Sequence, residues 1–363
     1  MDRVLEIDLL RFVAALSVVF FHYSFRGWAA DNFTSMHYPA VIPVAKYGWL
    51  GVHLFFIISG FVISMTAQSG CARRFVISRI VRLYPAYWFC CTLTFLTIVA
   101  AGAPYFHASL SRYLVNMTML NSVIKVEAID GAYWSLFVEL RFYGLVMLLL
   151  LFRQAARMEI FLGLWLILCI VTSGFGIRRL PWFIIPEYAP YFVAGAVFYL
   201  IWKHGSSPYR GTLVGASFAL SAMRVALETA DYAVYYKTSF SAAASVTLVA
   251  VFFAAFMAIS SRLTSRFASP VYIWLGVLTY PLYLLHQFIG FIIFNVTYGR
   301  VNVHIIFWGT IALMILLAYC VHTYLESWSA PALKRVLQRL LRVPTTRPPR
   351  ADNGMAQLVG SRE

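Results

Sequence analysis

Long apolar stretches with few charges recur along almost the whole of this chain. A stretch of about 20 apolar residues is long enough to cross the roughly 30 Å hydrocarbon core of a bilayer as an α-helix. The stretches are continuous and do not alternate with polar residues, which argues against a membrane β-barrel. We therefore expect a bundle of about ten transmembrane helices, at residues 5–24, 47–66, 85–103, 133–152, 158–176, 183–202, 211–229, 240–260, 275–297 and 304–325.

The composition leads to the same fold class. Hydrophobic residues make up 61% of the 363 residues and charged residues 12%, with a mean hydropathy of +0.75. A soluble fold cannot hide that much apolar surface from water, so we predict an all-α polytopic membrane protein embedded in a lipid bilayer.

The basic residues are unevenly distributed between the expected loops. With the N-terminus in the cytoplasm, 18 of the 29 Lys and Arg residues fall in cytoplasmic segments and eight in outside loops. This asymmetry follows the positive-inside rule and predicts that both termini are cytoplasmic. It also accounts for the net charge of +15 without a nucleic-acid partner. Residues 331–363 are expected to be a basic cytoplasmic tail, largely disordered around "TTRPPR".

The first apolar stretch carries Asp8, Arg11 and His22. An ionisable group at membrane depth costs on the order of 2.5–3.5 kcal/mol on insertion scales, so a site or a cavity is the default expectation. Eleven residues at about 100° each place Arg11 and His22 on one helical stripe, about 16 Å apart along the axis. Asp8 lies one turn before Arg11 and can pair with it. The alternative is an ion pair near the interface and a hydrogen-bonded core histidine.

Arg79 and Arg82 lie at the inner edge of the third stretch, in "RRFVISRIVRLYPAYW". Their i, i+3 spacing projects both guanidinium groups from one helical face. Two such groups suit a phosphate or pyrophosphate, which arginine binds in a bidentate manner. The alternative is that they only mark a cytoplasmic loop.

Two further stretches place polar side chains at membrane depth. "YWSLFVELRFYG" carries Glu139 about two turns inside, with Trp134 and Ser135 at its mouth, and "TYPLYLLHQ" places Tyr283 and His286 on adjacent turns. A buried carboxylate needs a partner or water. Trp134 has the alternative role of an interfacial anchor.

Six motifs occur in a fixed order over residues 1–330: "EIDLLRFVAALSVVFFH", "GWLGVHLFFIISGFVIS", "RFVISRIVRLYPAYW", "YWSLFVELRFY", "TYPLYLLH" and "YLESWSAP". In this order they resemble the acyltransferase-3 family of integral-membrane acyltransferases. The resemblance implies a single ten-helix acyltransferase domain over 1–330. It implies that the protein moves an acyl group, usually acetyl, from cytoplasmic acyl-CoA to a hydroxyl of a glycan, such as an O-antigen or exopolysaccharide, or of a lipid-linked sugar.

The resemblance carries over to particular residues. Arg11 and His22 match the family's Arg and His separated by ten residues, and Arg79 and Arg82 match its Arg-x-x-Arg motif. The chain departs from the family at 139–141, where Glu-Leu-Arg replaces a pattern that often has two acids, or an acid and a glutamine.

These observations lead to a hypothesis for the site. Arg11, Arg79 and Arg82 are expected to bind acyl-CoA, with acetyl-CoA as the expected donor. His22 is expected to be the general base, with Glu139 orienting it as the carboxylate does in a serine-protease triad. Substrate contacts are expected from Asp8, Trp134, Ser135, Tyr283 and His286.

The resemblance favours a bacterial inner-membrane enzyme. No metal is expected, because the five cysteines have neither metal-site nor disulfide spacing. The alternative is a multi-pass transporter of a small anionic or sugar-like substrate, which would bury the same charges along a polar path. A transporter would not release free CoA from acyl-CoA.

Overall fold

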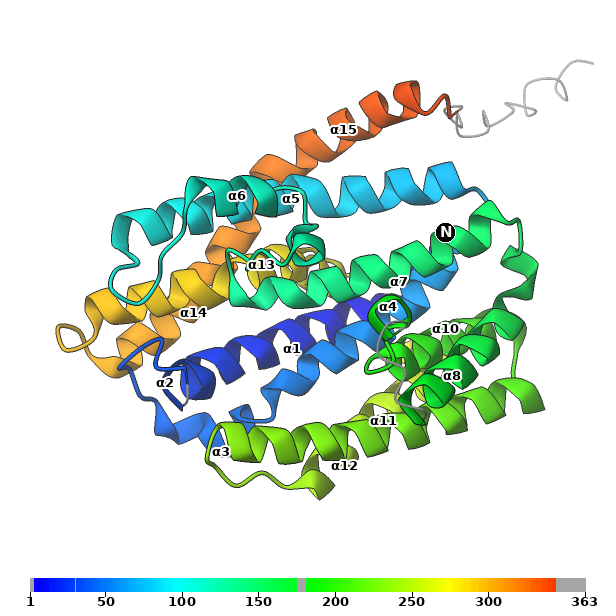
Figure 1. The fold of residues 1–363 in the computed structure, drawn as a ribbon, viewed down its shortest axis with the longest axis horizontal. Helices are drawn as coiled ribbons and strands as arrows, with labels where there is room; N and C mark the ends of the chain where they lie inside the picture. Colours follow the sequence, from blue (N-terminus) through cyan, green and yellow to red (C-terminus); the bar gives the residue numbers. More distant parts are fainter. Residues whose placement is uncertain (1–2, 30, 175–180, 344–363) are drawn as a thin grey trace, which may run out of the picture.

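The computed structural model describes residues 3–29, 31–174 and 181–343, which form a helical bundle without β-strands (Figure 1). Ten helices of this part of the chain have 16 or more residues, and each overlaps one of the ten expected spans. They are α1 (Leu5–Phe21), α4 (Gly51–Ala67), α5 (Ala72–Ala101), α7 (Trp134–Leu151), α8 (Met158–Gly174), α10 (Ala189–His204), α11 (Pro208–Tyr235), α12 (Ala242–Ser260), α13 (Val271–Thr297) and α14 (Val303–Cys320).

The other helical segments are shorter. Two π-helical turns continue α1 and α14, at His22–Arg26 and Val321–Glu326. The short α-helices are α2 (Gly27–Ala29), α3 (Ile42–Ala45), α6 (Leu110–Asn116), α9 (Pro181–Ile184) and α15 (Ser327–Leu340).

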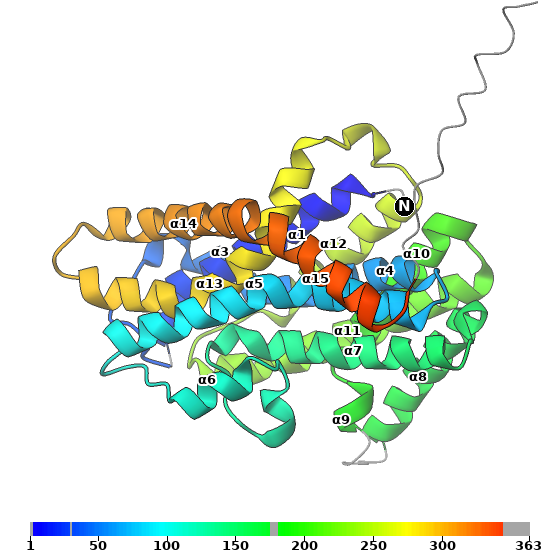
Figure 2. The same ribbon diagram turned by 90° about the horizontal axis from the view of Figure 1, so that it is seen from above.

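Helix α15 packs against α5 (Figure 2) and contains the first part of the segment expected to be a disordered tail. Residues 331–340 are helical because apolar and basic residues alternate there at helical spacing, so that one face can rest on α5. The "TTRPPR" stretch lies outside the described residues.

The membrane class of the fold is confirmed. Within the described residues, eight helical segments are long and apolar enough to cross a membrane. Helices α1 and α10, which have 17 and 16 residues, are not among the eight. The count of ten spans and the side of the two termini therefore stay predictions.

Helix α5 begins well before the expected third span, at Ala72 rather than at residue 85. Pro85 marks an expected start in the sequence, yet it lies inside the helix. Arginine is a good helix former, so the "RRFVISRIVR" segment extends the helix towards the expected cytoplasm. Arg79 and Arg82 therefore project from a rigid helix, and not from a loop.

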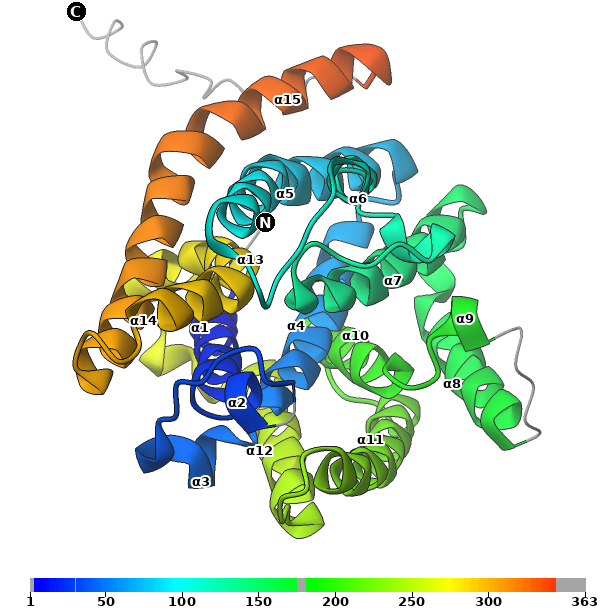
Figure 3. The same ribbon diagram turned by 60° about the vertical axis from the view of Figure 1, so that its left-hand side comes forward.

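The middle of the bundle is built from four packed helices. Helix α4 packs against α1 and α10, and α1 packs against α13. Figure 3 shows α1 and α4 side by side near the centre, with α13 and α10 on either side. These four helices come from both halves of the chain, so a site between them joins residues far apart in sequence.

Glycines allow α4 and α10 to approach closely. A Cβ atom at Gly195 would lie 1.9 Å from the carbonyl oxygen of Ile57, and one at Gly60 would lie 2.2 Å from that of Phe192. Small residues at helix contacts are a usual basis of packing in membranes, where lipid is as apolar as the side chains.

We expect Gly195→Ala to lower the free energy of unfolding by about 1–3 kcal/mol, because the added methyl group must push two helix backbones apart. Thermal unfolding of the protein in detergent measures the effect. Gly144→Ala is the matched control, because a Cβ there meets nothing within 4 Å. Equal melting temperatures for the two variants would contradict the close contact of α4 and α10.

Candidate functional site

Three arginines from two helices line one space inside the bundle, which we call the arginine cavity. Its wall comes from α1, α4, α5, α7 and α13. Arg11, Arg79 and Arg82 line it together with Glu139. The structure thus brings together all three residues that the sequence analysis assigned to the donor.

Arg11 is paired with Asp8, as the i, i+3 spacing predicts. The Asp8 carboxylate lies 3.1 Å from Nη1 of Arg11 and 2.6 Å from Nε of Arg3. Asp8 is buried against α13, where a Cβ atom at Gly276 would come within 2.5 Å of it. Asp8 itself is not part of the cavity wall. Its position is that of a partner for Arg11, and not of a residue that contacts a ligand in the cavity.

Arg79 and Arg82 contact neutral groups. Nη2 of Arg79 donates to the Thr66 hydroxyl at 3.3 Å, and its guanidinium lies 5.8 Å from the Tyr143 ring centre. The Arg82 guanidinium lies 5.6 Å from the ring centre of Tyr280. Neither arginine forms a salt bridge with a carboxylate of the described residues. Their positive charge is available to an anion in the cavity.

Glu139 lies in the arginine cavity and does not contact His22. Its carboxylate accepts hydrogen bonds from the Ser59 hydroxyl and, at 2.6 Å, from the Tyr143 hydroxyl. Glu139 therefore faces α4 and its own helix one turn on, and the expected contact that would orient His22 is not formed. The neighbouring Arg141 lies with its guanidinium 5.2 Å from the Phe137 ring centre.

The partner of His22 is His286. Nδ1 of His22 lies 3.0 Å from Nε2 of His286 and 2.9 Å from the carbonyl oxygen of Val18. Nδ1 of His286 lies 2.8 Å from the carbonyl oxygen of Tyr283. Both imidazoles are buried. We refer to them as the histidine pair.

The partners of the histidine pair fix where its protons lie. A carbonyl oxygen can only accept, so Nδ1 of His286 carries a proton and Nε2 of the neutral ring is an acceptor. Nδ1 of His22 then faces two acceptors, Val18 and His286, and carries a proton as well. This assignment leaves a free lone pair on Nε2 of His22. A general base needs such a lone pair to accept a proton.

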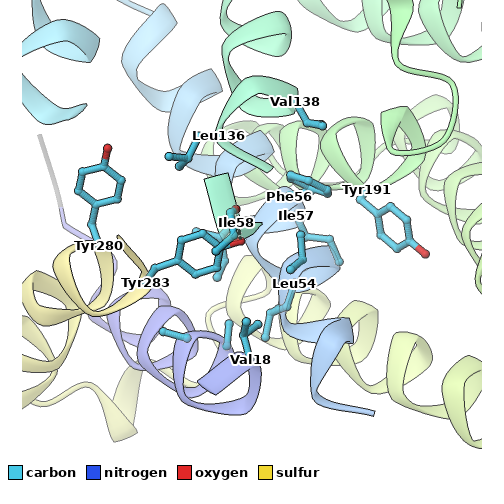
Figure 4. Close-up of a cluster of buried hydrophobic side chains, with 14 of the residues drawn as sticks. Val18, Leu54, Phe56, Ile57, Ile58, Leu136, Val138, Tyr191, Tyr280 and Tyr283 are labelled. Carbon is cyan, nitrogen blue, oxygen red and sulfur yellow. Dashed lines mark hydrogen bonds between the residues drawn. The ribbon is translucent and has the colours of Figure 1, made fainter. Parts of the chain in front are cut away.

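His22 opens on a second space, which we call the outer chamber. Val52 and Tyr283 line both the outer chamber and the arginine cavity, and Tyr283 points from α13 toward Ile58 of α4 (Figure 4). The Tyr283 hydroxyl lies 2.7 Å from the Ser135 hydroxyl. Tyr283 is therefore the wall between the two spaces. The other polar or aromatic residues around the outer chamber are Phe21, Arg26, Trp49, His53, Trp134, Glu228 and Tyr232.

The α13 backbone beside His286 is held by side chains of other segments. The hydroxyls of Tyr23 and Tyr133 donate to the carbonyls of His286 and Leu284, at 2.6 and 3.1 Å. The Asp130 carboxylate accepts from the N–H of Phe288 at 2.9 Å. In a membrane, backbone groups have no water to bond with, and these three side chains hold the turn of α13 from Leu284 to Phe288.

The sequence analysis missed the residues that complete the outer chamber. Nε2 of His53 lies 3.0 Å from the Glu228 carboxylate, which joins α4 to α11. The available signal was a histidine within the apolar motif "GWLGVHLFFIISGFVIS", since ionisable groups at this depth are unusual. Glu228 lies in one of the least apolar of the expected spans, and nothing in the sequence indicates that it faces His53.

No cluster of three or more His, Cys, Asp or Glu side chains suited to a metal ion occurs among residues 3–29, 31–174 and 181–343. The arrangement instead offers an anion-binding cavity and, beyond Tyr283, a basic nitrogen beside a polar chamber.

Comparisons with known proteins bear on the whole bundle. The sequence model of the acyltransferase domain named Acyl_transf_3 matches residues 4–323. A protein of Acidianus two-tailed virus described as "Putative acetyltransferase ORF330" is 24% identical over 294 residues, which is 77% of this chain and 82% of the viral protein. No solved structure matches the chain at a significant level. The family match covers most of the chain, including the residues that line the arginine cavity and the outer chamber. This protein therefore belongs to the acyltransferase-3 family of membrane acyltransferases.

Proposed function

We propose that this protein transfers an acyl group, with acetyl as the expected one, from acyl-CoA to a hydroxyl of a glycan or lipid-linked sugar, in the bacterial inner membrane. The observation that carries the proposal is the arrangement of the two spaces. An anion-binding cavity with Arg11, Arg79 and Arg82 lies on one side of Tyr283, and the free nitrogen of His22 lies on the other. The description of the viral relative as an acetyltransferase supports acetyl.

The arginine cavity suits the donor. CoA carries a diphosphate and a 3′-phosphate, and guanidinium groups bind phosphate through charge-assisted, bidentate hydrogen bonds. Arg79 and Arg82 lie towards the expected cytoplasmic end of α5, where acyl-CoA is found. Arg11, on α1, is partly compensated by Asp8 and is suited to the remaining phosphate charge or to the pantetheine arm.

The transfer step uses His22 as the base. Nε2 of His22 takes the proton of the acceptor hydroxyl while that oxygen attacks the thioester carbonyl carbon. The carbon–sulfur bond of the tetrahedral intermediate then breaks, and the CoA thiolate leaves and takes up the proton from His22. The Tyr283 hydroxyl lies in the wall shared by the two spaces, and it can donate to the oxyanion once it leaves its present acceptors, the Ser135 hydroxyl and the Ala132 carbonyl.

The contacts of Glu139 and His286 favour roles other than those expected from the sequence. Glu139 holds Ser59 and Tyr143 and balances the cationic charge of the arginine cavity. His286 holds the His22 tautomer. Trp134 lines the outer chamber, where it keeps its expected role as a contact for the acceptor.

We expect His22→Ala to lower acyl transfer by about 10²- to 10⁴-fold, the usual contribution of a general base, while acetyl-CoA binding is retained. Release of free CoA from acetyl-CoA by the purified protein, with a host glycan extract as acceptor, measures the effect. His107→Ala is the control, because His107 is an exposed histidine outside both spaces. Undiminished turnover in His22→Ala would exclude His22 as the base. No CoA release by the wild type would favour a transporter.

We expect the double variant Arg79→Ala/Arg82→Ala to raise the KM for acetyl-CoA by about tenfold or more, since each lost charge-assisted hydrogen bond weakens the donor complex. The same CoA-release assay at varied acetyl-CoA concentration gives this KM. Arg73→Ala/Arg74→Ala on the same helix is the matched control, because both arginines are exposed and neither lines the cavity. A similar rise in both double variants would point to general electrostatic attraction rather than to a donor site.

A further inference from the structure

The outer chamber has the size of a water site. The space that the centre of a water molecule can occupy in it is about 20 Å³. A cavity of roughly 10–15 Å³ on this measure already holds one water. Two buried polar atoms of its wall, Nε1 of Trp49 and Nδ1 of His53, have no hydrogen-bond partner among the described residues. Buried polar groups of this kind are commonly satisfied by an internal water, so the chamber suits one water molecule.

The hydrogen-bonding groups around the chamber also match a water. Nε2 of His53 lies 3.0 Å from the Glu228 carboxylate, which can only accept, so Nε2 carries the proton and Nδ1 of the neutral ring accepts. Trp49 supplies an N–H donor. His22 lines the same space and has the free lone pair on its Nε2. A water both donates and accepts, and in this chamber it lies beside the base of the proposed transfer step.

A water beside a general base competes with the acceptor. If this water reached the thioester, Nε2 of His22 would take its proton while its oxygen attacked the carbonyl carbon. The carbon–sulfur bond would then break, and the CoA thiolate would take up the proton from His22. The products would be free CoA and acetic acid, with no acceptor acylated. An enzyme that transfers a reactive group therefore has to keep such a water away from it.

Tyr283 forms the barrier between this chamber and the donor cavity. Only Val52 and Tyr283 line both spaces. Val52 is β-branched and has a stiff side chain. The Tyr283 hydroxyl is held by the Ser135 hydroxyl at 2.7 Å and by the Ala132 carbonyl at 3.1 Å. Tyr283 is therefore the part of the shared wall that can move, and its present position separates the chamber from the arginine cavity.

Entry of the acceptor requires this wall to move. A hydroxyl group is about the size of a water, but it is attached to a carbon skeleton for which the chamber has no room. When the Tyr283 side chain gives way, its hydroxyl leaves Ser135 and Ala132 and becomes available to the oxyanion. This is induced fit, in which the correct substrate opens the path and a water alone does not.

We propose that Tyr283 selects transfer over hydrolysis, because it shields the acyl thioester from the chamber water until the acceptor hydroxyl has replaced that water. The inference rests on the proposed function for the acyl donor and for His22 as the base. It adds the residue that keeps the protein from acting as an acyl-CoA hydrolase.

The ratio of released acetate to acylated acceptor measures this selection. The purified full-length protein, acetyl-CoA with a radiolabelled acetyl group and a host glycan extract give both products in one reaction. We expect Tyr283→Ala to raise the ratio by about tenfold or more, because water then reaches the thioester without an acceptor. Both reactions use His22 and the same oxyanion donor, so the loss of the Tyr283 hydroxyl slows both and leaves the ratio as a measure of the shield.

Three further variants control the experiment. Tyr283→Phe keeps the ring and loses both hydrogen bonds, so we expect a ratio between those of the wild type and Tyr283→Ala, and it decides the test if thermal unfolding shows that Tyr283→Ala does not fold. Adding His22→Ala to Tyr283→Ala is expected to remove the added acetate release. Tyr280→Ala is the matched control, because Tyr280 is a buried tyrosine of α13 that lines the arginine cavity but not the outer chamber. We expect its ratio to equal that of the wild type at saturating acetyl-CoA.

The outcomes separate the inference from the proposed function. Equal ratios in the wild type and both Tyr283 variants, or the same rise in Tyr280→Ala, would overturn the inference and leave acyl transfer intact. If the wild type acylates no glycan but Tyr283→Ala releases more acetate in a His22-dependent manner, the proposed acceptor fails and the shield stands. Absence of both products in every variant would contradict both.

Discussion

The hydrogen bonds that other segments make to the α13 backbone hold the site in place. Tyr23 and Tyr133 donate to carbonyls of α13, and Asp130 accepts from the N–H of Phe288. These contacts fix the same turn that presents His286 to His22. In the membrane interior no water is present to replace them, so the side chains must come from the protein itself. The geometry of the histidine pair therefore depends on three side chains that belong to neither space.

The two spaces on either side of Tyr283 differ in charge, and the low polarity of the membrane interior makes this difference important. Cations gathered in one space raise the cost of burying any further cation beside them, unless an anion enters. The wall of the arginine cavity has three guanidinium groups and one carboxylate, Glu139, so its net charge favours an anionic ligand. Beyond Tyr283, Arg26 is paired with Asp31, and a neutral imidazole can persist there. A neutral His22 is the form that accepts a proton, so keeping the phosphate-binding charge on the far side of Tyr283 supports its role as a base.

The sequence determines much of the fold and part of the site. Hydrophobic length indicated the positions of the ten long helices, since apolar stretches can be found in the sequence without knowledge of their neighbours, and eight helical segments of the described residues are long and apolar enough to span a bilayer. The spacing from Arg11 to His22 and from Arg79 to Arg82 could be read, since helical periodicity is local. The sequence analysis expected Glu139 to orient His22, but the carboxylate bonds to Ser59 instead. Helix packing decides which of the two it faces, and one sequence does not show that packing. Glu228 and Trp49 were missed for the same reason: their partners come from other helices.

The two spaces also bear on how the acyl group travels. None of the described cysteines lines the arginine cavity or the outer chamber, and Cys90 and Cys91 are buried elsewhere on α5. A covalent route would need an activated nucleophile between donor and acceptor. The groups found there are the hydroxyls of Ser135 and Tyr283, bonded to each other, and the Ser135 hydroxyl also donates to the carbonyl of Ala132. Within the described residues these hydroxyls bond to each other and to the Ala132 carbonyl, while His22 contacts Val18 and His286, so neither hydroxyl is paired with the base. This arrangement favours direct attack by the acceptor hydroxyl on the thioester, with His22 moving only the proton.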